Sequence, residues 1–596
     1  MPVVAISVNR LNGLLGKKYE MCMLVDALEQ LGCDVEDTAM LALYRCHACQ
    51  APNEKLEQED APKRCDFCGF ESDEPFEKFA SDPVIRLDLL ADRPDLFDVG
   101  GLSRALKGYM GLEQGLSQIT VTDGSVTVDV DAAMSNEDTF RPFIVCAVVQ
   151  MPPLDHNSLR DVMRLQENLH WGIGRDRKLS SIGVYDLDTI KPPIRYSTVD
   201  PGKFKFCPLG MPGKRMTAKQ IIEEHPKGVA YAHLMETYKR YPILVDSDHQ
   251  VLSMPPIINS EETKCKIGTS RLFIDVTGIT KDAVVNSLNT IVSALIELGG
   301  DVETVRMNFP EQEQYTPDLN PRKIIIEYEA AKRWLGLDFS RDEFVNYLRK
   351  MRLNVEPQGN VYEVSYPAFR TDIRHEVDVF EDIAIGYGYQ NIPAKLVSSM
   401  TIGSARAEEK ISQIARDAMI GLGFTEIMTL LLQSIDRQFT KYQMQPDQKH
   451  VIVENPKTIE QKVVRSHLMT GILETFQKNR RKAVPQRIFE IGNIVLINPE
   501  METGVNEYRH LAFGVIGPEA GYAEGRAILD SVLREIGSKG EYKAAAHPAF
   551  SEGRLAEVTN SNGLWARIGE IHPQVLNNFG LSSPVAYCEL RLMRVI

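Results

Sequence analysis

Four cysteines near the N-terminus have the spacing of a metal site. They occur as two CxxC pairs, Cys46 with Cys49 and Cys65 with Cys68, separated by a polar stretch. Each pair can bring two thiolates to one ion from a tight turn, and two pairs complete the tetrahedral shell that Zn²⁺ prefers. Four thiolates leave no position open for water, so we expect a structural zinc rather than a catalytic one. A redox-active pair would open a helix after an apolar strand, a context that neither CxxC has.

Four carboxylates form a second candidate cation site. Asp372 lies at the expected start of a helix, and Asp378, Glu381 and Asp382 share one face of it at positions i, i+3 and i+4. Carboxylates so placed repel one another unless a cation or an arginine lies among them, and oxygen ligands select Mg²⁺ or Ca²⁺. The alternative is an N-terminal cap followed by a solvated acidic face, which the helix dipole favours.

Asp275 and Thr277 belong to a third candidate site, on an expected strand over residues 273–278. Residues two apart on a strand project to the same face, so a carboxylate and a hydroxyl would meet one ligand there, while Ile274 and Val276 point to the opposite face. The pattern alone favours a simpler interpretation, in which both polar side chains only satisfy local hydrogen bonds at the end of a strand.

The bulk composition is that of a large globular protein. The chain has 596 residues, of which 43% are hydrophobic and 25% charged, and its net charge is −15. This length predicts about three to five domains. The acidic balance argues against a protein that coats nucleic acid nonspecifically, although it allows a local basic face. No secretory signal and no run of about 18 apolar residues is found, and six further cysteines are scattered, so we expect a protein of the reducing cytosol.

Changes of periodicity and polar linkers divide the chain into the modules that would position these sites. Strand-like and helix-like segments are mixed throughout, which predicts an α+β multidomain protein. The expected modules are an N-terminal α/β module at residues 1–115 that holds the cysteine ribbon at 45–72, an α+β domain at 140–310, a small α/β module at 321–396 and a last domain at 400–596. The last domain is expected to open with an amphipathic helix that buries Ile411, Ile414, Met419 and Leu422.

Four further stretches carry a family resemblance. They are residues 92–104, 251–259, 366–393 and 485–492. In this order and spacing they resemble the β subunits of phenylalanyl-tRNA synthetases of the archaeal and eukaryotic type. The resemblance covers nearly the whole chain and leaves out only the cysteine ribbon. Acidic residues surround that ribbon, which favours a staple for a loop over a contact with tRNA or a zinc-ribbon regulator of nucleic acid.

The resemblance implies a partner-dependent enzyme subunit in the cytoplasm. Members of this family are α2β2 heterotetramers in which the α chain uses ATP to charge tRNA(Phe) and the β chain hydrolyses misacylated Tyr-tRNA(Phe). It implies a B3/B4-type editing domain at 140–310, a winged-helix-like B5-type module at 321–396, and a class II synthetase-like antiparallel sheet without an active site at 400–596. Arg487 resembles the arginine of the second class II motif, but no third motif follows, so we expect only a structural strand there.

The resemblance also implies which residues act. An apolar pocket for phenylalanine cannot strongly reject tyrosine, which adds only a hydroxyl, so a second site that binds the hydroxyl and hydrolyses the ester is needed. The positions that match this editing pocket are Leu244, Ser253, Asp275 and Thr277. The carboxylates at 372, 378, 381 and 382 match a magnesium site of the family.

Two alternatives stay open at this level. Arg175, Arg177 and Lys178 could contact tRNA phosphates at the mouth of the pocket or form an ordinary solvated surface. The chain as a whole could be a noncatalytic tRNA-binding scaffold that has lost editing. The presence of Ser253, Asp275 and Thr277 favours the hydrolytic subunit.

Overall fold

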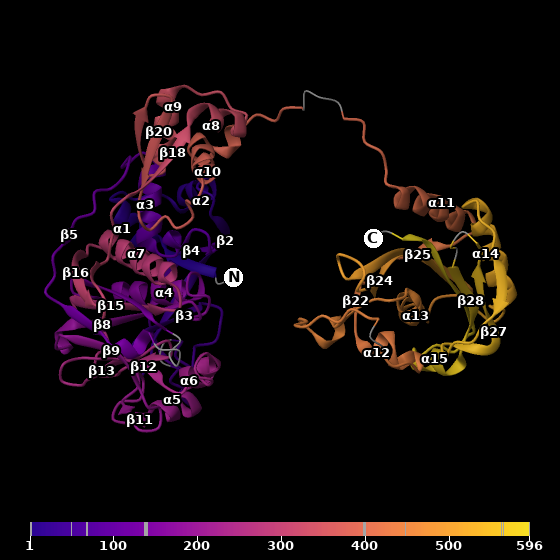
Figure 1. Cartoon of the computed structure of the whole chain (residues 1–596), viewed down its shortest axis with the longest axis horizontal. Helices are drawn as coiled ribbons and strands as arrows, with labels where there is room; N and C mark the ends of the chain where they lie inside the picture. The colour runs from indigo at the N-terminus through magenta and orange to yellow at the C-terminus, as the bar shows by residue number, and fades with distance from the viewer. Residues whose placement is uncertain are drawn as a thin grey trace. The chain divides into compact units, whose positions relative to one another are not determined.

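The computed structural model forms two compact units, residues 1–395 and 396–596, which are described separately (Figure 1). It describes residues 3–48, 50–66, 69–135, 141–396, 401–446, 449–561, 563 and 565–594. Both units mix helices with sheets, so the expected α+β multidomain class is confirmed. Among the described helices, none combines the length and the apolar character needed to cross a bilayer.

The first unit begins with a four-stranded antiparallel sheet in the order β1-β4-β2-β3. Its strands are β1 (Val3–Ser7), β2 (Asp34–Arg45), β3 (Pro52–Leu56) and β4 (Glu77–Asp88). The helices of this region are α1 (Val8–Leu15), α2 (Met21–Gln30) and α3 (Val99–Tyr109). The long strands β2 and β4 extend beyond β1 and carry β3 and the cysteine ribbon on their far ends.

An eleven-stranded sheet forms the centre of the first unit. Its strands are β5 (Val121–Thr122), β6 (Thr127–Val130), β7 (Phe143–Gln150), β8 (Ser180–Asp186), β9 (Ile194–Val199), β12 (Tyr241–Val245), β13 (Val251–Met254), β14 (Ile258–Asn259), β15 (Arg271–Gly278), β16 (Asp301–Asn308) and β17 (Glu313–Thr316). A separate pair, β10 (Lys205–Phe206) and β11 (Met216–Thr217), lies beside it. The helices of this region are α4 (His156–Trp171), α5 (Ala218–Glu224), α6 (Pro226–Tyr231) and α7 (Lys281–Glu297).

The alternation of side chains along β15 divides the core of this sheet into two. Ile274 and Val276 pack with the buried residues of α4 and α7. Phe273 packs on the opposite face, with Leu244 and Tyr196 of the neighbouring strands. The strand and its two faces therefore match the prediction, and Asp275 belongs to the face that turns away from the helices.

The first unit ends in a three-stranded antiparallel sheet in the order β18-β20-β19. The strands are β18 (Arg322–Glu327), β19 (Asn354–Gln358) and β20 (Val361–Tyr366), and the helices are α8 (Tyr328–Leu335), α9 (Arg341–Lys350) and α10 (Glu376–Tyr387). The prediction that a helix starts at Asp372 is wrong, because Asp372 binds Arg370 and the N-cap of α10 is His375.

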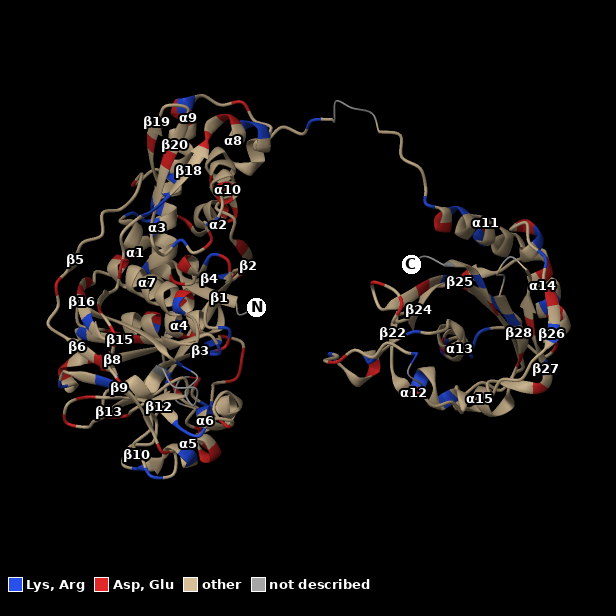
Figure 2. Cartoon of the chain, viewed as in Figure 1, with Lys and Arg blue, Asp and Glu red and all other residues tan. Residues whose placement is uncertain are grey.

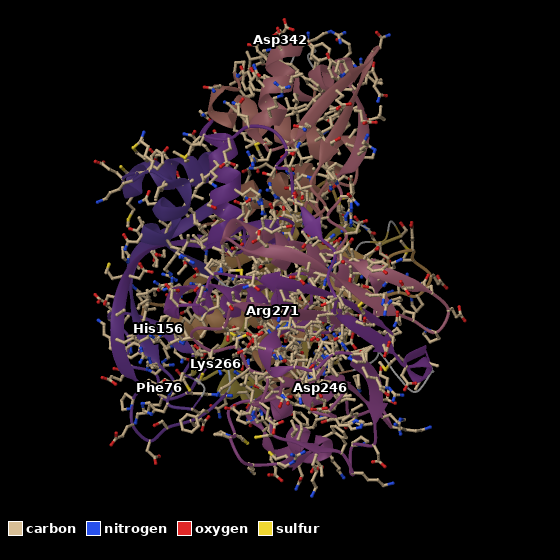
Figure 3. The ribbon with its side chains drawn as sticks, turned by 90° about the vertical axis from the view of Figure 1, so that its left-hand side faces the viewer. Phe76, His156, Asp246, Lys266, Arg271 and Asp342 are labelled. Carbon is tan, nitrogen blue, oxygen red and sulfur yellow. The ribbon has the colours of Figure 1, made fainter. Side chains whose placement is uncertain are left out.

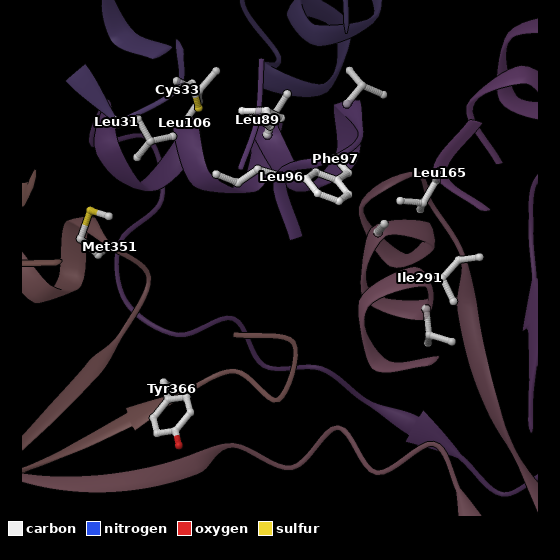
Figure 4. Close-up of a cluster of buried hydrophobic side chains, with 14 of the residues drawn as sticks. Leu31, Cys33, Leu89, Leu96, Phe97, Leu106, Leu165, Ile291, Met351 and Tyr366 are labelled. Atoms are coloured by element: carbon white, nitrogen blue, oxygen red, sulfur yellow. The ribbon is translucent and has the colours of Figure 1, made fainter. Parts of the chain in front are cut away.

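One hydrophobic cluster joins several modules of the first unit, while separate smaller clusters fill the rest of it. It contains Val4 of the first strand, Ile291 of α7 and Ile385 of α10. In Figure 4, Leu106 of α3 and Met351, which follows α9, belong to this one cluster although they come from modules far apart in the sequence. The first unit is therefore held together by a core that no single module completes.

The second unit is built on a seven-stranded sheet in the order β21-β24-β25-β29-β28-β27-β26, antiparallel except for β21 and β24. The strands are β21 (Thr425–Glu426), β24 (Gln486–Ile497), β25 (Val505–Ile516), β26 (Glu541–Ala544), β27 (Phe550–Thr559), β28 (Trp565–Ile571) and β29 (Val585–Arg594), with a small pair β22 (Leu432–Gln433) and β23 (Val463–Val464). The helices are α11 (Ala407–Gly421), α12 (Ile435–Gln438), α13 (Met469–Lys478), α14 (Tyr522–Glu535) and α15 (Pro573–Asn578).

Two separate cores lie on the two faces of this sheet. Met419 of α11 and Leu529 of α14 pack with one face, and Ile472 of α13 and Val575 of α15 pack with the other. The expected amphipathic helix is α11, but Ile414 is 45% exposed instead of buried. The buried residues of α11 are Ser412, Ala415 and Met419. The prediction counted only large apolar side chains and therefore left out the serine and the alanine.

We expect Gly101→Ala to destabilise the first unit. A Cβ at this position in α3 would lie 1.7 Å from the backbone oxygen of Asp95, which cannot move away as a flexible side chain would. The free energy of unfolding should fall by about 2 kcal/mol or more, measured by urea unfolding of the full-length chain. Gly13→Ala is the matched control, because nothing lies within 4 Å of its added Cβ. Equal unfolding curves for the two variants would contradict this packing of α3.

Candidate functional site

A cavity of about 80 Å³ lies beside β8, the last strand in the order of the eleven-stranded sheet, and is bordered by residues of both faces of this strand and by helix α4. Its polar lining includes Ser253 of β13, Asp275 of β15 and Tyr185 of β8. The loop after β13, with a cis peptide bond between Pro255 and Pro256, forms another side. Three strands and one loop therefore bring together residues that are far apart in the sequence.

Asp275, Tyr185 and Ser253 form one buried hydrogen-bond network. Their exposed fractions are 1%, 0% and 3%. The Tyr185 hydroxyl lies 2.5 Å from Oδ1 of Asp275 and 2.8 Å from Oγ of Ser253. Because a hydroxyl has one proton, Tyr185 donates to the carboxylate and accepts from Ser253. The arrangement places an acceptor-rich carboxylate next to two hydroxyls at the cavity wall.

Burial controls the charge of this network. Loss of water raises the pKa of Asp275 to about 7, against the opposing effects of the Tyr185 hydrogen bond and the charge of Arg141. Burial, together with the neighbouring Asp275, raises the pKa of Tyr185 well above its usual value, so the phenol stays protonated. Near neutral pH the carboxyl can therefore either accept or donate a proton.

Gly183 is what makes room for the network. It pairs with Asp275 across β8 and β15, and a Cβ there would lie 1.9 Å from the Tyr185 hydroxyl and 2.3 Å from Oδ1 of Asp275. Tyr185 and Gly183 were not identified from the sequence. The available signal was a glycine within a continuous apolar strand, which often marks a close approach of other atoms.

The other two expected pocket residues lie behind the cavity wall. Thr277 is fully buried, and its hydroxyl lies 3.2 Å from Oγ of Ser181 and 3.4 Å from Nε of Arg141. Leu244 is also fully buried, in the register position opposite Ser253. Of the four residues, Ser253 and Asp275 thus line the cavity, while Thr277 and Leu244 support the strands that carry them.

The expected basic cluster is divided by the fold. Arg177 is buried, forms an ion pair with Glu167 at 2.8 Å and donates to the carbonyls of Pro256 and Ile257 at 3.2 and 2.9 Å. The φ angles of residues 175, 176 and 177 are 48°, 55° and 64°, a left-handed turn that directs Arg177 inward. Arg175 and Lys178 remain exposed. Only these two are accessible to a phosphate, whereas Arg177 fixes the loop after the cis peptide bond.

The two described cysteines of the expected zinc ribbon are buried and lie in similar turns. Cys46 and Cys65 are 0% and 1% exposed, and Cys49 and Cys68 lie outside the described residues. The amide of Cys46 donates to the carbonyl of Ala51 at 3.0 Å, and the amide of Cys65 donates to the carbonyl of Phe70 at 2.8 Å. The two turns thus repeat one another.

Donors also point at both described sulfurs of the ribbon. The amide of Ala48 lies 3.4 Å from Sγ of Cys46, and Nδ2 of Asn53 lies 3.6 Å from Sγ of Cys65. Hydrogen bonds of this kind stabilise a coordinating thiolate. The turns and donors therefore fit the expected zinc, and zinc binding by the four cysteines stays a prediction.

Arginines lie among the carboxylates of the expected magnesium site. Nη2 of Arg370 lies 2.7 Å from Asp372 and 2.9 Å from Asp382. Asp378 accepts from the amides of residues 374 and 375 and so caps α10. Glu381 is exposed on that helix. Within the described residues no group of three or more acidic, histidine or cysteine side chains has the arrangement of a metal site. Magnesium binding stays a prediction, and no step below depends on it.

The chain is similar to known proteins over most of its length. Residues 324–389 match the family described as tRNA synthetase B5 domain, and residues 392–592 match the phenylalanyl tRNA synthetase beta chain CLM domain. The phenylalanine–tRNA ligase beta subunit of Methanosphaera stadtmanae is 37% identical over 523 residues, which cover 86% of this chain and 93% of that one. The subunit of the same name from Methanosarcina barkeri is 40% identical over 514 residues, 86% of this chain and 92% of that one.

A solved structure extends the similarity to the fold of the first unit. The crystal structure of an N-terminal fragment of the phenylalanyl-tRNA synthetase beta subunit from Pyrococcus horikoshii is 34% identical, with a TM-score of 0.55, and the match covers 65% of this chain and 99% of the fragment. Because the sequence matches extend along nearly the full length of the relatives, the chain belongs to the family of phenylalanine–tRNA ligase β subunits.

Proposed function

We propose that this chain hydrolyses Tyr-tRNA(Phe) in its first unit, while a partner α chain charges tRNA(Phe) with phenylalanine at the expense of ATP in an α2β2 complex in the cytoplasm. The observation that carries the proposal is the buried network of Asp275, Tyr185 and Ser253 at the wall of a cavity. Burial of a carboxylate beside two hydroxyls lowers the free energy of unfolding unless all three groups are hydrogen-bonded. A ligand with a hydroxyl of its own can supply a further hydrogen bond to these groups.

The network can distinguish the two amino acids by their hydrogen bonds. A tyrosyl phenol can donate to Asp275, whereas phenylalanine, which shares the ammonium group with tyrosine, offers no hydroxyl and leaves the acceptor without that partner. Ser253 then orients either the phenol or a water molecule. In the hydrolysis the water oxygen adds to the ester carbonyl carbon, the carbon–oxygen bond to the terminal ribose breaks, and the freed ribose oxygen takes a proton. Tyrosine and uncharged tRNA are released.

Local contacts, rather than overall charge, must hold the tRNA. Lys and Arg are interspersed with Asp and Glu over both units (Figure 2), in keeping with the net charge of −15. Arg175 and Lys178 are exposed on the left-handed turn that follows α4. We assign them to phosphates near the 3′ end of the tRNA, because they are neighbours in the chain of Arg177, which lines the cavity, and positive side chains position the nucleic-acid backbone without reading its sequence.

Exposed apolar side chains of the second unit provide the surface for the α chain. Met428 is 95% exposed, Leu430 69% and Ile459 80%. Large apolar side chains gathered on two neighbouring segments of one unit are typical of a protein–protein interface. We call Met428, Leu430 and Ile459 the docking set.

We expect Asp275→Asn to abolish the hydrolysis of Tyr-tRNA(Phe). The amide keeps the shape of the side chain but removes the carboxylate that accepts from Tyr185, and the rate should fall roughly 100-fold or more. Charging with phenylalanine by the same α–β complex should not change. Asp301→Asn, an exposed carboxylate at the start of β16, is the control and should retain both activities. A wild-type complex without hydrolysis would instead support the noncatalytic scaffold.

We expect the hydrolysis to rise with pH through neutrality. The pKa of Asp275, raised by burial to about 7, makes the ionised form the major one only above that pH. Tyr185→Phe removes a hydrogen bond that lowers this pKa, so the midpoint of the pH–rate profile should move upward, and Asp275→Asn should remove it. A profile that Tyr185→Phe leaves unchanged would show that the network does not control the rate.

The same pKa has a consequence for stability that can be measured separately. In the unfolded chain the carboxyl ionises near its ordinary pKa of 3.8, whereas in the folded chain it keeps its proton up to about 7. Between these values the unfolded state loses the proton first, so this group makes the free energy of unfolding fall as pH rises. Asp275→Asn should remove that slope in urea unfolding at pH values across this window.

We expect the double variant Met428→Asp, Leu430→Asp to weaken the α–β association. Two charges placed on an apolar interface lose water without gaining a partner, and sedimentation should show free β chain where the wild type is assembled. Met23→Asp, at a position that is 50% exposed in the first unit, is the control. Unchanged assembly of the double variant would exclude the docking set from the interface.

A further inference from the structure

The cysteine ribbon, residues 45–72, reaches the candidate cavity directly. Ala51, which lies between the two CxxC pairs and is 5% exposed, belongs to the lining of the cavity together with Ser253 and Asp275. Phe76, which follows the ribbon in the chain, and His156 at the start of α4 lie on the same side of the first unit (Figure 3). The ribbon is therefore placed against the eleven-stranded sheet and not on a remote surface.

A second contact joins the ribbon to helix α6. A Cβ added to Gly69 would lie 2.8 Å from Cβ of Pro226, the first residue of α6. Leu209 packs against the ribbon cluster of Cys46, Cys65 and Phe76, and its carbonyl lies 3.1 Å from Nε2 of His225, the N-cap of α6. The ribbon thus supports this short helix from one side, through the turn next to the second CxxC pair.

A third contact joins the ribbon to helix α4. Glu54 of β3 lies 3.5 Å from Arg160 and 3.1 Å from Arg164 of that helix. The following turns of α4 supply Met163 and Glu167 to the cavity lining. Both helices that close the cavity on this side are therefore held by the ribbon.

These helices connect in turn to the loop that carries the cis peptide bond. Lys227 of α6 lies 3.7 Å from Glu167 of α4, and Glu167 lies 2.8 Å from Arg177. Arg177 binds the carbonyls of Pro256 and Ile257, next to Ser253 in the chain. A series of contacts therefore leads from the ribbon to the loop beside the Asp275 network.

We expect a bound ion to contribute to the fold of the ribbon. Its buried apolar cluster contains few residues, mainly Ala42, Tyr44 and Phe76 with the two described cysteines. A segment of this size cannot bury enough apolar surface to fold alone, and small ribbons of this kind gain their folding free energy from the metal.

We propose that the zinc-loaded ribbon is the outer wall of the hydrolytic cavity, so that loss of the ion impairs hydrolysis of the tyrosyl ester and spares the charging reaction. This inference rests on the proposed function. It assigns the ribbon to the wall of the cavity. There Ala51 limits the volume open to a ligand, and Gly69 packs against Pro226 at the start of α6.

The first test removes the ion from the intact α–β complex. The zinc content should be about one ion per β chain. A zinc-selective chelator, followed by excess Mg²⁺ for the charging assay, should lower Tyr-tRNA(Phe) hydrolysis roughly tenfold and leave charging unchanged. Amide hydrogen exchange should increase at residues 226–231 and 255–259. A complex without zinc, or one that loses zinc with neither exchange nor hydrolysis changed, would overturn the proposal.

The second test leaves the cysteines intact. Ala51→Phe places a ring in the cavity and should lower the hydrolysis at least tenfold without loss of zinc, while Asp60→Phe places the same ring on an exposed turn of the ribbon and should change neither. Equal hydrolysis by the two variants would overturn the assignment of Ala51 to the wall. A wild-type complex that cleaves no tyrosyl ester would overturn the proposed function instead, and the hydrogen-exchange result would still decide whether the ribbon holds the cavity.

Discussion

The burial of the Asp275 carboxylate is the constraint on which the first unit depends. A carboxylate without water costs several kcal/mol unless hydrogen bonds replace the lost hydration. Here the replacement comes from the Tyr185 hydroxyl on the neighbouring strand β8, and Ser253 on a more distant strand hydrogen-bonds that hydroxyl in turn. The register of the sheet must therefore be correct to the residue, because a slip by one position would turn Asp275 into the apolar core under α4 and α7. Gly183 meets the same requirement by leaving space where every other residue would add a Cβ.

The two expected metal sites differ in the groups that stabilise their negative charge. In the cysteine ribbon the described sulfurs receive N–H donors, the arrangement that a thiolate bound to an ion requires. Among the carboxylates around α10, Arg370 supplies the positive charge within the protein itself. The pKa of Asp382 is nevertheless raised by burial to about 6, against the effect of that arginine. Its carboxylate therefore titrates close to the physiological range.

Local patterns in the sequence predicted those parts of the structure that depend on local physics. The alternation along residues 273–278 gave the correct faces of β15, and helical spacing gave α11, the helix that opens the last domain. The start of α10 was misplaced because an ion pair with Arg370 competes with the helix for Asp372. The sequence did not predict Tyr185 as a site residue, because a buried aromatic residue in an apolar strand usually has only a packing role. Its partners, Ser253 and Asp275, become neighbours only through the pairing of distant strands, which no single segment of sequence encodes.

The core that runs from Val4 to Ile385 has a consequence for the synthesis of the chain. A ribosome adds roughly 5–20 residues per second, so the first strand waits on the order of 20 to 80 seconds before the last helix of its core is available. During that time Leu106 and its neighbours lack the later part of the core, from α7 and from residues near α9, that helps to cover them in the finished protein. The nascent chain therefore presents apolar surface for much of its translation, and the cell must shield it until α10 has left the ribosome.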